Sequence, residues 1–374
     1  MANQEILLVS HSAALGGAEL FLVDLAKAIP PSRVCLFEHG PLEERLSNAQ
    51  VPFVVLKAGE RLRGVRRDSG IRSVIGSIGA VFALVRSLLA VARDGEILFA
   101  NSQKSLVVCS IACMLRRCRL TWHLHDILSS QHFGRLQRST SIILSNLTAT
   151  DVSANSDAAA SAYRIGGGVH TPIPLYNIVS VPSTEEDPAL PANLRRDQPI
   201  IGSFSRFAAW KGVDVAVTAM ASVPNAQLIL VGGALFEGDR PYAEVLRAQI
   251  RASGQAHRIF ELGFRSDISD LMRICDVIVH ASRSPEPFGR VIAEALALGV
   301  PVIASRGGGT GEIIEHGETG WLLEPGDPEA LAETMRYALG NVGHARRMAE
   351  AGRERVLDRY SRDRLLEQIR MLFK

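Results

Sequence analysis

Two glutamates, Glu286 and Glu294, have a spacing that suggests one extended ligand. Glu286 precedes a Pro-Phe-Gly turn, and Glu294 lies eight residues later in an apolar helical pattern. At about 1.5 Å of rise per residue the carboxylates would stand about 12 Å apart, whereas an acid–base pair on one glycosidic bond needs about 5–9.5 Å. The expected helix start near Phe288, Gly289 and Arg290 offers N–H groups that favour a phosphate. A capping role for Glu286 and a surface position for Glu294 remain the alternative.

A second candidate is the segment SFSRFAAWKGVDVAV, 203–217, which begins at the end of an expected strand. Arg206 and Lys211 lie in its loop, and Gly212 opens the next helix. Two cations directed into a cleft would hold a diphosphate and neutralise the charge that grows as it leaves. Two solvated surface cations are the alternative, and that is the usual environment of Arg and Lys.

Glycine clusters end several expected strands. Gly16 and Gly17 follow the first strand, Gly232 and Gly233 end QLILVGG, and 307–309 follow PVIAS. Each would let the backbone approach a ligand closely, and each is equally well explained as a tight turn. The sequence contains neither G-x-G-x-x-G after the first strand nor G-x-x-x-x-G-K-[ST], which argues against a standard nicotinamide site and a P-loop.

A polar group, His123, His125 and Asp126, ends another expected strand. A metal site would need a further ligand that the sequence does not place nearby. His125 or Asp126 would hydrogen-bond a sugar or act as an acid or base, and a structural histidine is an equal alternative.

The elements that must position these residues alternate along the whole chain. Short apolar runs followed by helical patterns predict an α/β protein with doubly wound parallel sheets. A proline-rich segment of mixed charge predicts a linker at 181–198. We therefore expect a Rossmann-like N-terminal domain at 1–180, a C-terminal donor domain at 199–355, and a helix at 356–374 that crosses back to the first domain. Ligands of such sheets bind at the carboxyl ends of the strands, so we expect the site in the cleft between the domains.

The expected elements form two halves of similar size. Strands are expected at 5–10, 34–39, 52–57, 96–101, 120–125 and 150–155, and then at 199–205, 227–233, 258–263, 277–282, 301–305 and 320–325. Helices are expected at 17–29, 73–93, 104–116 and 133–146, then at 212–222, 240–253, 267–274 and 289–298, and through the tail from 328.

Length and composition are those of an ordinary globular protein. The 374 residues correspond to about two domains, each able to bury its own core. The net charge is +2, so nothing in the composition indicates a nucleic-acid partner. The cysteines number only five, an odd and low count, and we expect no secretory signal at the N-terminus. Both features are typical of a reducing, cytoplasmic compartment.

The segment 61–93 is the one that suggests a membrane. An arginine-rich stretch precedes residues 73–92, an apolar run with a single charge, Arg86. Its length is about that of a transmembrane helix, although serines and glycines interrupt it. We expect a helix packed on a sheet. A spanning helix, or a weak contact with an anionic membrane surface, remains an alternative.

Taken in order, these elements resemble the GT-B glycosyltransferases, most closely the retaining group known as glycosyltransferase family 4. The resemblance covers most of the chain and includes the glycine pair with an acid at 16–19, His125-Asp126, and the S-R-x4-K-G element at 205–212. It also includes Leu262, Gly263 and Asp267. Its most specific parts are EPFGRVIAEALALGVPVIAS and the glycine-rich stretch that follows. Arg290 departs from the pattern, because the family usually has an apolar residue there.

The resemblance implies donor-binding roles. Arg206 and Lys211 would bind the diphosphate and Glu294 the ribose, and the base would lie near Phe264 and Arg265. The implied donor-binding residues are Gly17, Arg206, Lys211, Gly233, Phe264, Arg265, Glu286, Phe288, Gly289, Arg290 and Glu294. The implied catalytic residues are Glu286, His125, Arg206 and Lys211. Glu286 would face the sugar hydroxyls and His125 would touch the transferred sugar, while the acceptor-binding residues stay unassigned.

The resemblance also implies an activity: a retaining, metal-independent glycosyltransferase with a UDP- or GDP-sugar donor as substrate, no cofactor, and a saccharide or lipid-linked acceptor. We expect a bacterial enzyme of surface polysaccharide or glycolipid biosynthesis, cytoplasmic or peripheral at the inner face of the plasma membrane. The alternatives are a GT-B sugar-nucleotide epimerase or phosphorylase and a non-catalytic nucleotide-sugar-binding scaffold.

Overall fold

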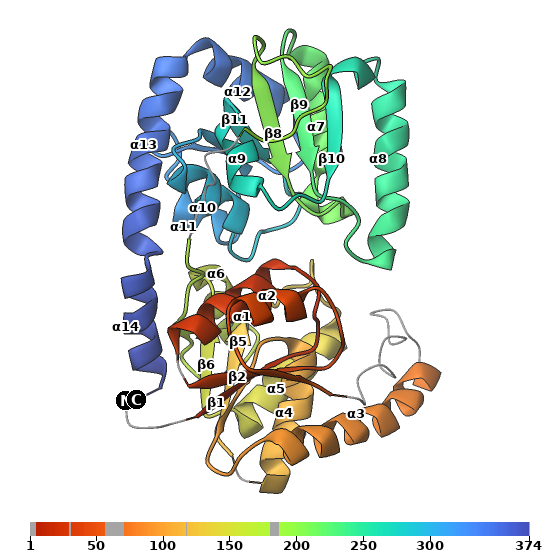
Figure 1. Ribbon diagram of the computed structural model, residues 1–374, viewed down its shortest axis with the longest axis vertical. Helices are drawn as coiled ribbons and strands as arrows, with labels where there is room; N and C mark the ends of the chain where they lie inside the picture. The colour runs from red at the N-terminus through yellow and green to blue at the C-terminus, as the bar shows by residue number, and fades with distance from the viewer. Residues whose placement is uncertain (1–4, 30, 57–70, 117, 180–186, 374) are drawn as a thin grey trace. The chain divides into compact units, whose positions relative to one another are not determined.

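The computed structural model describes residues 5–29, 31–56, 71–116, 118–179 and 187–373, with the backbone alone for 71–78 (Figure 1). The chain divides into two compact units, one of Met1–Ile178 with Leu365–Lys374 and one of Val179–Arg364. The boundary between Arg364 and Leu365 falls within the last helix of the chain. Residues 181–186 of the expected linker lie outside the described residues.

Within its described residues, the first unit is built on a seven-stranded parallel sheet of order β3-β2-β1-β4-β5-β6-β7. The strands are β1 (Ile6–Ser10), β2 (Ser32–Leu36), β3 (Phe53–Val55), β4 (Ile97–Ala100), β5 (Leu120–Leu124), β6 (Asp151–Ala154) and β7 (Ile173–Pro174). Its helices are α1 (Gly17–Ala28), α2 (Leu42–Asn48), α3 (Ile71–Val91), α4 (Gln103–Arg116), α5 (Arg135–Thr148), α6 (Asp157–Ile165) and most of α14 (Arg362–Leu372).

Strand β1 shows why the sheet is covered on both faces. Successive side chains of a strand point to opposite faces. Ile6 and Leu8 belong to a core formed with α1 and α14, and Leu7 and Val9 belong to a core formed with α3 and α4. A strand buried on both faces is mostly apolar, and the first four of the five residues of β1 are apolar.

Helix α3 covers most of the apolar run that suggested a membrane. Its side chains Leu84, Val85 and Leu88 are buried in the core of the first unit. The expectation of a helix packed on the sheet is confirmed. Among the residues that the structure describes, no helix combines the length and the hydropathy that crossing a bilayer requires.

The described part of the second unit contains a six-stranded parallel sheet of order β10-β9-β8-β11-β12-β13. The strands are β8 (Ile200–Phe204), β9 (Gln227–Val231), β10 (Ile259–Gly263), β11 (Val277–His280), β12 (Val302–Ser305) and β13 (Trp321–Leu323). The α-helices are α7 (Val213–Ala219), α8 (Arg240–Ala252), α9 (Ile268–Arg273), α10 (Arg290–Ala297), α11 (Thr310–Ile313), α12 (Pro328–Gly340) and α13 (Val342–Arg359). Short 3-10 turns are η2 (Ala209–Lys211), η3 (Met220–Ser222), η4 (Glu237–Asp239) and η5 (Ala256–Arg258).

Local chemistry explains two features of these helices. The side chain of Asp327 accepts hydrogen bonds from the backbone N–H groups of Glu329 and Ala330, and so caps the start of α12. The absence of a side chain at Gly352 lets α13 pack closely on α10. A Cβ at Gly352 would lie 2.8 Å from the side chain of Leu296.

Both sheets reverse their strand order beside the first strand of the unit. β1 lies between β2 and β4, and β8 lies between β9 and β11. Open α/β sheets bind ligands at such reversals, outside the carboxyl ends of the strands. The expected fold class, two Rossmann-like parallel α/β sheets, is confirmed.

Candidate active site

In the second unit, the loops after β8 and β11 bring Lys211 and Glu286 together. The two strands are parallel neighbours, so both loops leave the same edge of the sheet. Lys211 Nζ donates a hydrogen bond of 2.7 Å to Glu286 Oε2. Both side chains are largely buried, with 15% and 10% of their surface exposed. A buried ion pair therefore occupies the point where the strand order reverses.

Glu286 is held by more than this one contact. Its Oε2 also accepts a hydrogen bond of 3.2 Å from the hydroxyl of Ser282 and lies 3.4 Å from His280 Nε2. Burial disfavours the charged carboxylate, but the charge of Lys211 and the hydrogen bonds outweigh it, so the pKa of Glu286 lies below its usual value. Burial lowers the pKa of His280 to about 4. At neutral pH the cluster holds a carboxylate beside a neutral imidazole.

A glycine allows the Lys211 loop to pass close to the end of β11. Gly212 has a φ of +62°, and a Cβ there would lie 2.0 Å from the carbonyl oxygen of Ala281. The ammonium of Lys211 lies 4.2 Å from the centre of the Trp210 ring. Contact with a carboxylate and an aromatic face fixes this flexible side chain.

Arg206 lies near the same aromatic ring as Lys211, the indole of Trp210. Its guanidinium is 5.8 Å from the Trp210 ring and 5.0 Å from the Phe236 ring, and its Nε is 3.3 Å from Asp239 Oδ2. The structure thus gathers both predicted cations around Trp210, each with a carboxylate partner. An arriving diphosphate would have to share them with Asp239 and Glu286.

The glycine-rich loop after β12 supports the backbone around Glu286. Glu286 N–H donates to the carbonyl oxygen of Gly307 at 3.2 Å, and Gly309 N–H donates to that of Glu286 at 2.7 Å. A Cβ at Gly309 would lie 2.7 Å from the carbonyl oxygen of Pro287. Gly289, with a φ of +101°, then turns the chain into α10. The side chain of Phe288 is buried, so only the backbone of that residue suits a ligand.

Arg290 and Glu294 pair along α10. Arg290 Nε donates a hydrogen bond of 2.6 Å to Glu294 Oε1 one helical turn away. Arg290, the residue that departs from the family pattern, thus contacts the carboxylate to which the resemblance assigns the ribose.

The region expected to hold the base combines an exposed ring with a glycine. Phe264 is 64% exposed, and its ring lies 3.1 Å from the position a Cβ would take at Gly233. Arg265 Nε donates a 2.8 Å hydrogen bond to Asp267 Oδ1. An exposed aromatic face over a glycine backbone suits stacking by a flat ligand.

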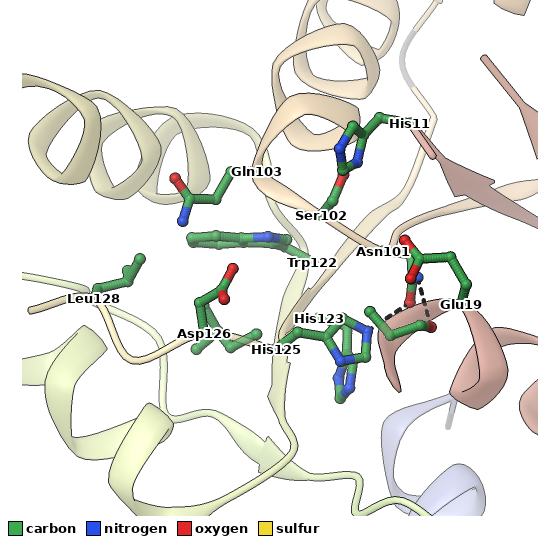
Figure 2. Close-up of a pocket in the computed structure, with 12 residues that line it drawn as sticks. His11, Glu19, Asn101, Ser102, Gln103, Trp122, His123, His125, Asp126 and Leu128 are labelled. Atoms are coloured by element: carbon green, nitrogen blue, oxygen red, sulfur yellow. Dashed lines mark hydrogen bonds between the residues drawn. The ribbon is translucent and has the colours of Figure 1, made fainter. Parts of the chain in front are cut away.

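The first unit has a pocket at the carboxyl ends of β1, β4 and β5. The cavity measures about 110 Å³. Figure 2 shows side chains from the ends of β4 and β5 and from the start of α1 gathered around it. The lining includes His11, Ala18, Glu19, Asn101, Ser102, Gln103, Trp122, His123, Leu124, His125, Asp126 and Leu128.

The protonation of His125 follows from its neighbours. Asn101 Nδ2 donates to the carbonyl oxygen of Ala18 at 3.0 Å, which turns Asn101 Oδ1 toward His125 Nε2 at 2.8 Å (Figure 2). Burial lowers the pKa of His125 to about 3, so the ring is neutral. Because Oδ1 can only accept, we assign the proton to Nε2 and the lone pair to Nδ1. The ring of His123 stands perpendicular to that of His125 at 4.3 Å.

The two glycines at the start of α1, Gly16 and Gly17, have different surroundings. The Glu19 carboxyl hydrogen-bonds the backbone N–H groups of Gly16 and Glu19, and burial raises its pKa to about 7. A Cβ at Gly16 would lie 2.5 Å from Glu19 Oε2, whereas a Cβ at Gly17 would meet nothing within 4 Å. A side chain at Gly16 would therefore displace the Glu19 carboxyl group, whereas Gly17 leaves open space.

Sequence reasoning did not single out several residues that contact the candidate residues. Ser282 and His280 contact Glu286, Trp210 contacts both cations, and Asn101 orients His125. His280 ends β11, Asn101 directly follows β4, and Ser282 lies two residues after β11, so their position at strand ends was the available signal. Across the described residues, no group of three or more His, Cys, Asp or Glu is arranged to hold a metal ion.

Two parallel α/β units with polar clusters where the strand order reverses define a GT-B protein. Residues 187–355 match the family described as Glycosyl transferases group 1. HepE of Anabaena, solved in complex with UDP and glucose, is 32% identical, with a TM-score of 0.86 and 99% of both chains covered. The chain belongs to the group 1 glycosyltransferases of GT-B fold, and the resemblance read from the motifs is confirmed.

Two curated relatives match part of the chain. N-acetyl-alpha-D-glucosaminyl L-malate synthase of Bacillus anthracis is 30% identical over 183 residues, which cover 48% of this chain and 46% of the relative. The lipopolysaccharide core biosynthesis glycosyltransferase LpsE of Rhizobium meliloti is 30% identical over 171 residues, 46% of this chain and 48% of the relative. The chain thus spans about half the length of the curated relatives it matches.

Proposed function

We propose that the protein transfers a glycosyl group from a nucleoside diphosphate sugar to a hydroxyl of a saccharide or lipid-linked acceptor, in surface polysaccharide or glycolipid biosynthesis. The observation that carries this proposal is the Lys211–Glu286 ion pair where β8 and β11 end, with Arg206 on the same indole. The relatives support it, since HepE was solved with UDP and glucose and LpsE is a glycosyltransferase of lipopolysaccharide core biosynthesis.

Arg206 and Lys211 bind the donor diphosphate in this proposal. Charge accumulates on the diphosphate as the bond to the sugar breaks, and two preorganised cations stabilise it without a metal ion. Each cation already has a carboxylate neighbour, which holds it in place before the donor arrives.

Other residues orient the remaining parts of the donor. Glu286 and the backbone of Phe288 and Gly289 face the sugar hydroxyls, and the lone pair of His125 Nδ1 accepts from a hydroxyl of the same sugar. Glu294, with Arg290 beside it, binds the ribose. The exposed ring of Phe264 stacks on the base, with Gly233 and Arg265 next to it, and Gly17 leaves room for the phosphate.

The reaction proceeds with retention and without metal or cofactor. The bond between the anomeric carbon and the phosphate oxygen breaks, and the acceptor oxygen bonds to that carbon on the same face. The acceptor proton passes to the departing diphosphate. Glu286 does not receive it, because Lys211 and the hydrogen bonds keep its pKa low.

We also assign the protein to the bacterial cytoplasm, with weak contact between 61–93 and an anionic membrane surface. Of this segment, Phe82 and Arg86 are exposed one helical turn apart on α3, on the side opposite the buried Leu84 and Leu88. An aromatic ring beside a cation suits the headgroup region of a membrane. Flotation with anionic and neutral vesicles at low salt tests this contact, and equal recovery with both would exclude it.

Thermal unfolding with UDP, GDP and their sugars, in the presence of a chelator, tests the donor. A ligand at 100 times its Kd adds about 2.7 kcal/mol to the stability of the folded state. We expect a shift with one nucleotide and a larger one with its sugar. Both shifts should be smaller in Lys211→Ala and unchanged in Lys27→Ala, which lies on an exposed face of α1. No shift with any nucleotide would contradict the proposal.

Product analysis then separates the alternatives. Transfer gives an acceptor-dependent product whose anomeric configuration, read by NMR, matches the donor. An epimerase would convert the donor without an acceptor, a phosphorylase would require inorganic phosphate, and a scaffold would bind the donor without turnover.

A further inference from the structure

Two cysteines of the first unit lie in direct contact. Cys113, in the last turn of α4, and Cys118, two residues before β5, have their Sγ atoms 2.8 Å apart. Both are free thiols. Four residues separate them in sequence, and the return of the chain from helix to strand brings them together.

Their surroundings differ in a way that assigns chemical roles. Cys113 is buried in the core between the sheet and α4, whereas Cys118 is partly exposed. The hydrogen bond from Cys113 and the charge of Arg116 lower the pKa of Cys118, while the same hydrogen bond and burial raise that of Cys113. Cys118 is therefore the more accessible and the more acidic of the two thiols, and Cys113 holds its proton more tightly beside it.

The remaining cysteines lack this combination. Cys35, Cys109 and Cys275 are buried, and burial raises the pKa of each thiol. Within the part of the chain that the structure describes, Cys113–Cys118 is the thiol–thiol contact found at hydrogen-bond distance.

We propose that Cys113 and Cys118 are a reversible modification site, which a peroxide converts to an intramolecular disulfide. The Cys118 thiolate attacks one peroxide oxygen, the O–O bond breaks, and Cys118 becomes a sulfenic acid as hydroxide leaves and takes a proton to form water. The Cys113 sulfur then attacks the Cys118 sulfur, the S–O bond breaks, and a second water leaves with the Cys113 proton. Two thiols are oxidised and one hydrogen peroxide is reduced to two waters.

Little movement is needed to form this bond. A disulfide requires the sulfurs to approach to about 2.05 Å, and they start 2.8 Å apart. The crosslink would tie the last turn of α4 to the segment entering β5. Both elements also contribute residues to the pocket of the first unit. Gln103 lies at the start of α4, and His123 lies near the end of β5. The inference does not depend on the proposed glycosyl transfer.

The test uses the reduced full-length protein treated with hydrogen peroxide and analysed by intact mass and thiol counting. We expect a loss of about 2 Da, the loss of two of the five thiols, and full reversal by dithiothreitol. Cys275→Ser serves as the matched control and retains both changes. Cys113→Ser stops at a Cys118 sulfenic acid, which dimedone traps.

Two results would overturn the proposal. One is a mass gain on Cys118 without thiol pairing in the wild type. The other is peptide mapping that places the disulfide on another pair of cysteines, or between two chains. Circular dichroism of each variant establishes that it is folded before oxidation.

Discussion

Lys211 Nζ lies 2.7 Å from Glu286 Oε2, although 75 residues separate the two in sequence. The contact exists because β8 and β11 are parallel neighbours whose loops leave one edge of the sheet. The cation that we propose for the leaving diphosphate and the carboxylate that we propose for the sugar hydroxyls thus hold each other in position.

Replacement of Lys211 should slow the reaction more than it changes donor affinity. In the proposed reaction, Lys211→Ala removes a charge that acts most strongly as the diphosphate departs, so we expect a loss of about 2–4 kcal/mol of transition-state stabilisation. Steady-state kcat/KM measures it, with Lys27→Ala as the control. Turnover close to that of the wild type would remove Lys211 from the site.

Removal of one partner of the ion pair should destabilise the second unit more than removal of both. Glu286→Leu leaves the largely buried Lys211 without its carboxylate, and such a change typically costs about 3–5 kcal/mol. The double variant Lys211→Met with Glu286→Leu leaves no unpaired charge, so most of this cost should disappear. Urea unfolding of the wild type, both single variants and the double variant measures the coupling. Additive losses would mean that the pair contributes no coupling energy.

The buried histidines should make the protein less stable in acid. The folded pKa values of His125 and His280, about 3 and about 4, lie below the usual 6.5. The unfolded chain therefore binds protons first. The histidine contribution is complete above pH 6.5 and is lost as the pH falls toward about 4 for His280 and about 3 for His125. Urea unfolding at pH 5 and 7.5 should show a smaller difference in His125→Asn than in the wild type. The exposed His257→Asn should keep the wild-type difference.

The titration of Glu19 should make the protein less stable as the pH rises, which is the opposite of the effect of the histidines. Burial raises its pKa from 4.5 to about 7, with Asp126 and Glu38 adding to the shift. The folded state holds the proton longer, so this contribution declines as the pH rises from about 4.5 to 7. Glu19→Gln keeps the capping geometry and removes the titration. Relative to the wild type, the variant should be more stable at pH 8 than at pH 5. A pH-independent difference would show that Glu19 does not titrate in this range.

Gly212 should tolerate no side chain. Gly212→Ala places a Cβ 2.0 Å from the carbonyl oxygen of Ala281 at a φ of +62°. We expect at least about 2 kcal/mol of destabilisation and a displaced Lys211. Gly340→Ala, at the end of α12 where a Cβ meets nothing within 4 Å, is the control and should be neutral or slightly stabilising. Equal stability of the two variants would contradict the steric argument.

Long, strongly patterned elements could be predicted from the sequence to within a residue or two. The expected strand at 199–205 is β8 (Ile200–Phe204), and the expected helix at 240–253 is α8. Short elements such as α2, α6, α11 and β7 were not predicted. Each is too short to establish a period, and tertiary contacts decide whether it forms.

The amino-acid sequence by itself determined the alternation of strands and helices, and with it the strand ends at which Arg206, Lys211, Glu286 and His125 lie. Apolar periodicity is a local property, so it can be read without knowing what the strands contact. Only the tertiary structure decided which side chains meet: Lys211 with Glu286, Arg206 with Asp239, Asn101 with His125, and Cys113 with Cys118. These partners depend on which strands are neighbours and on how each loop turns, and those are set by packing over the whole sheet.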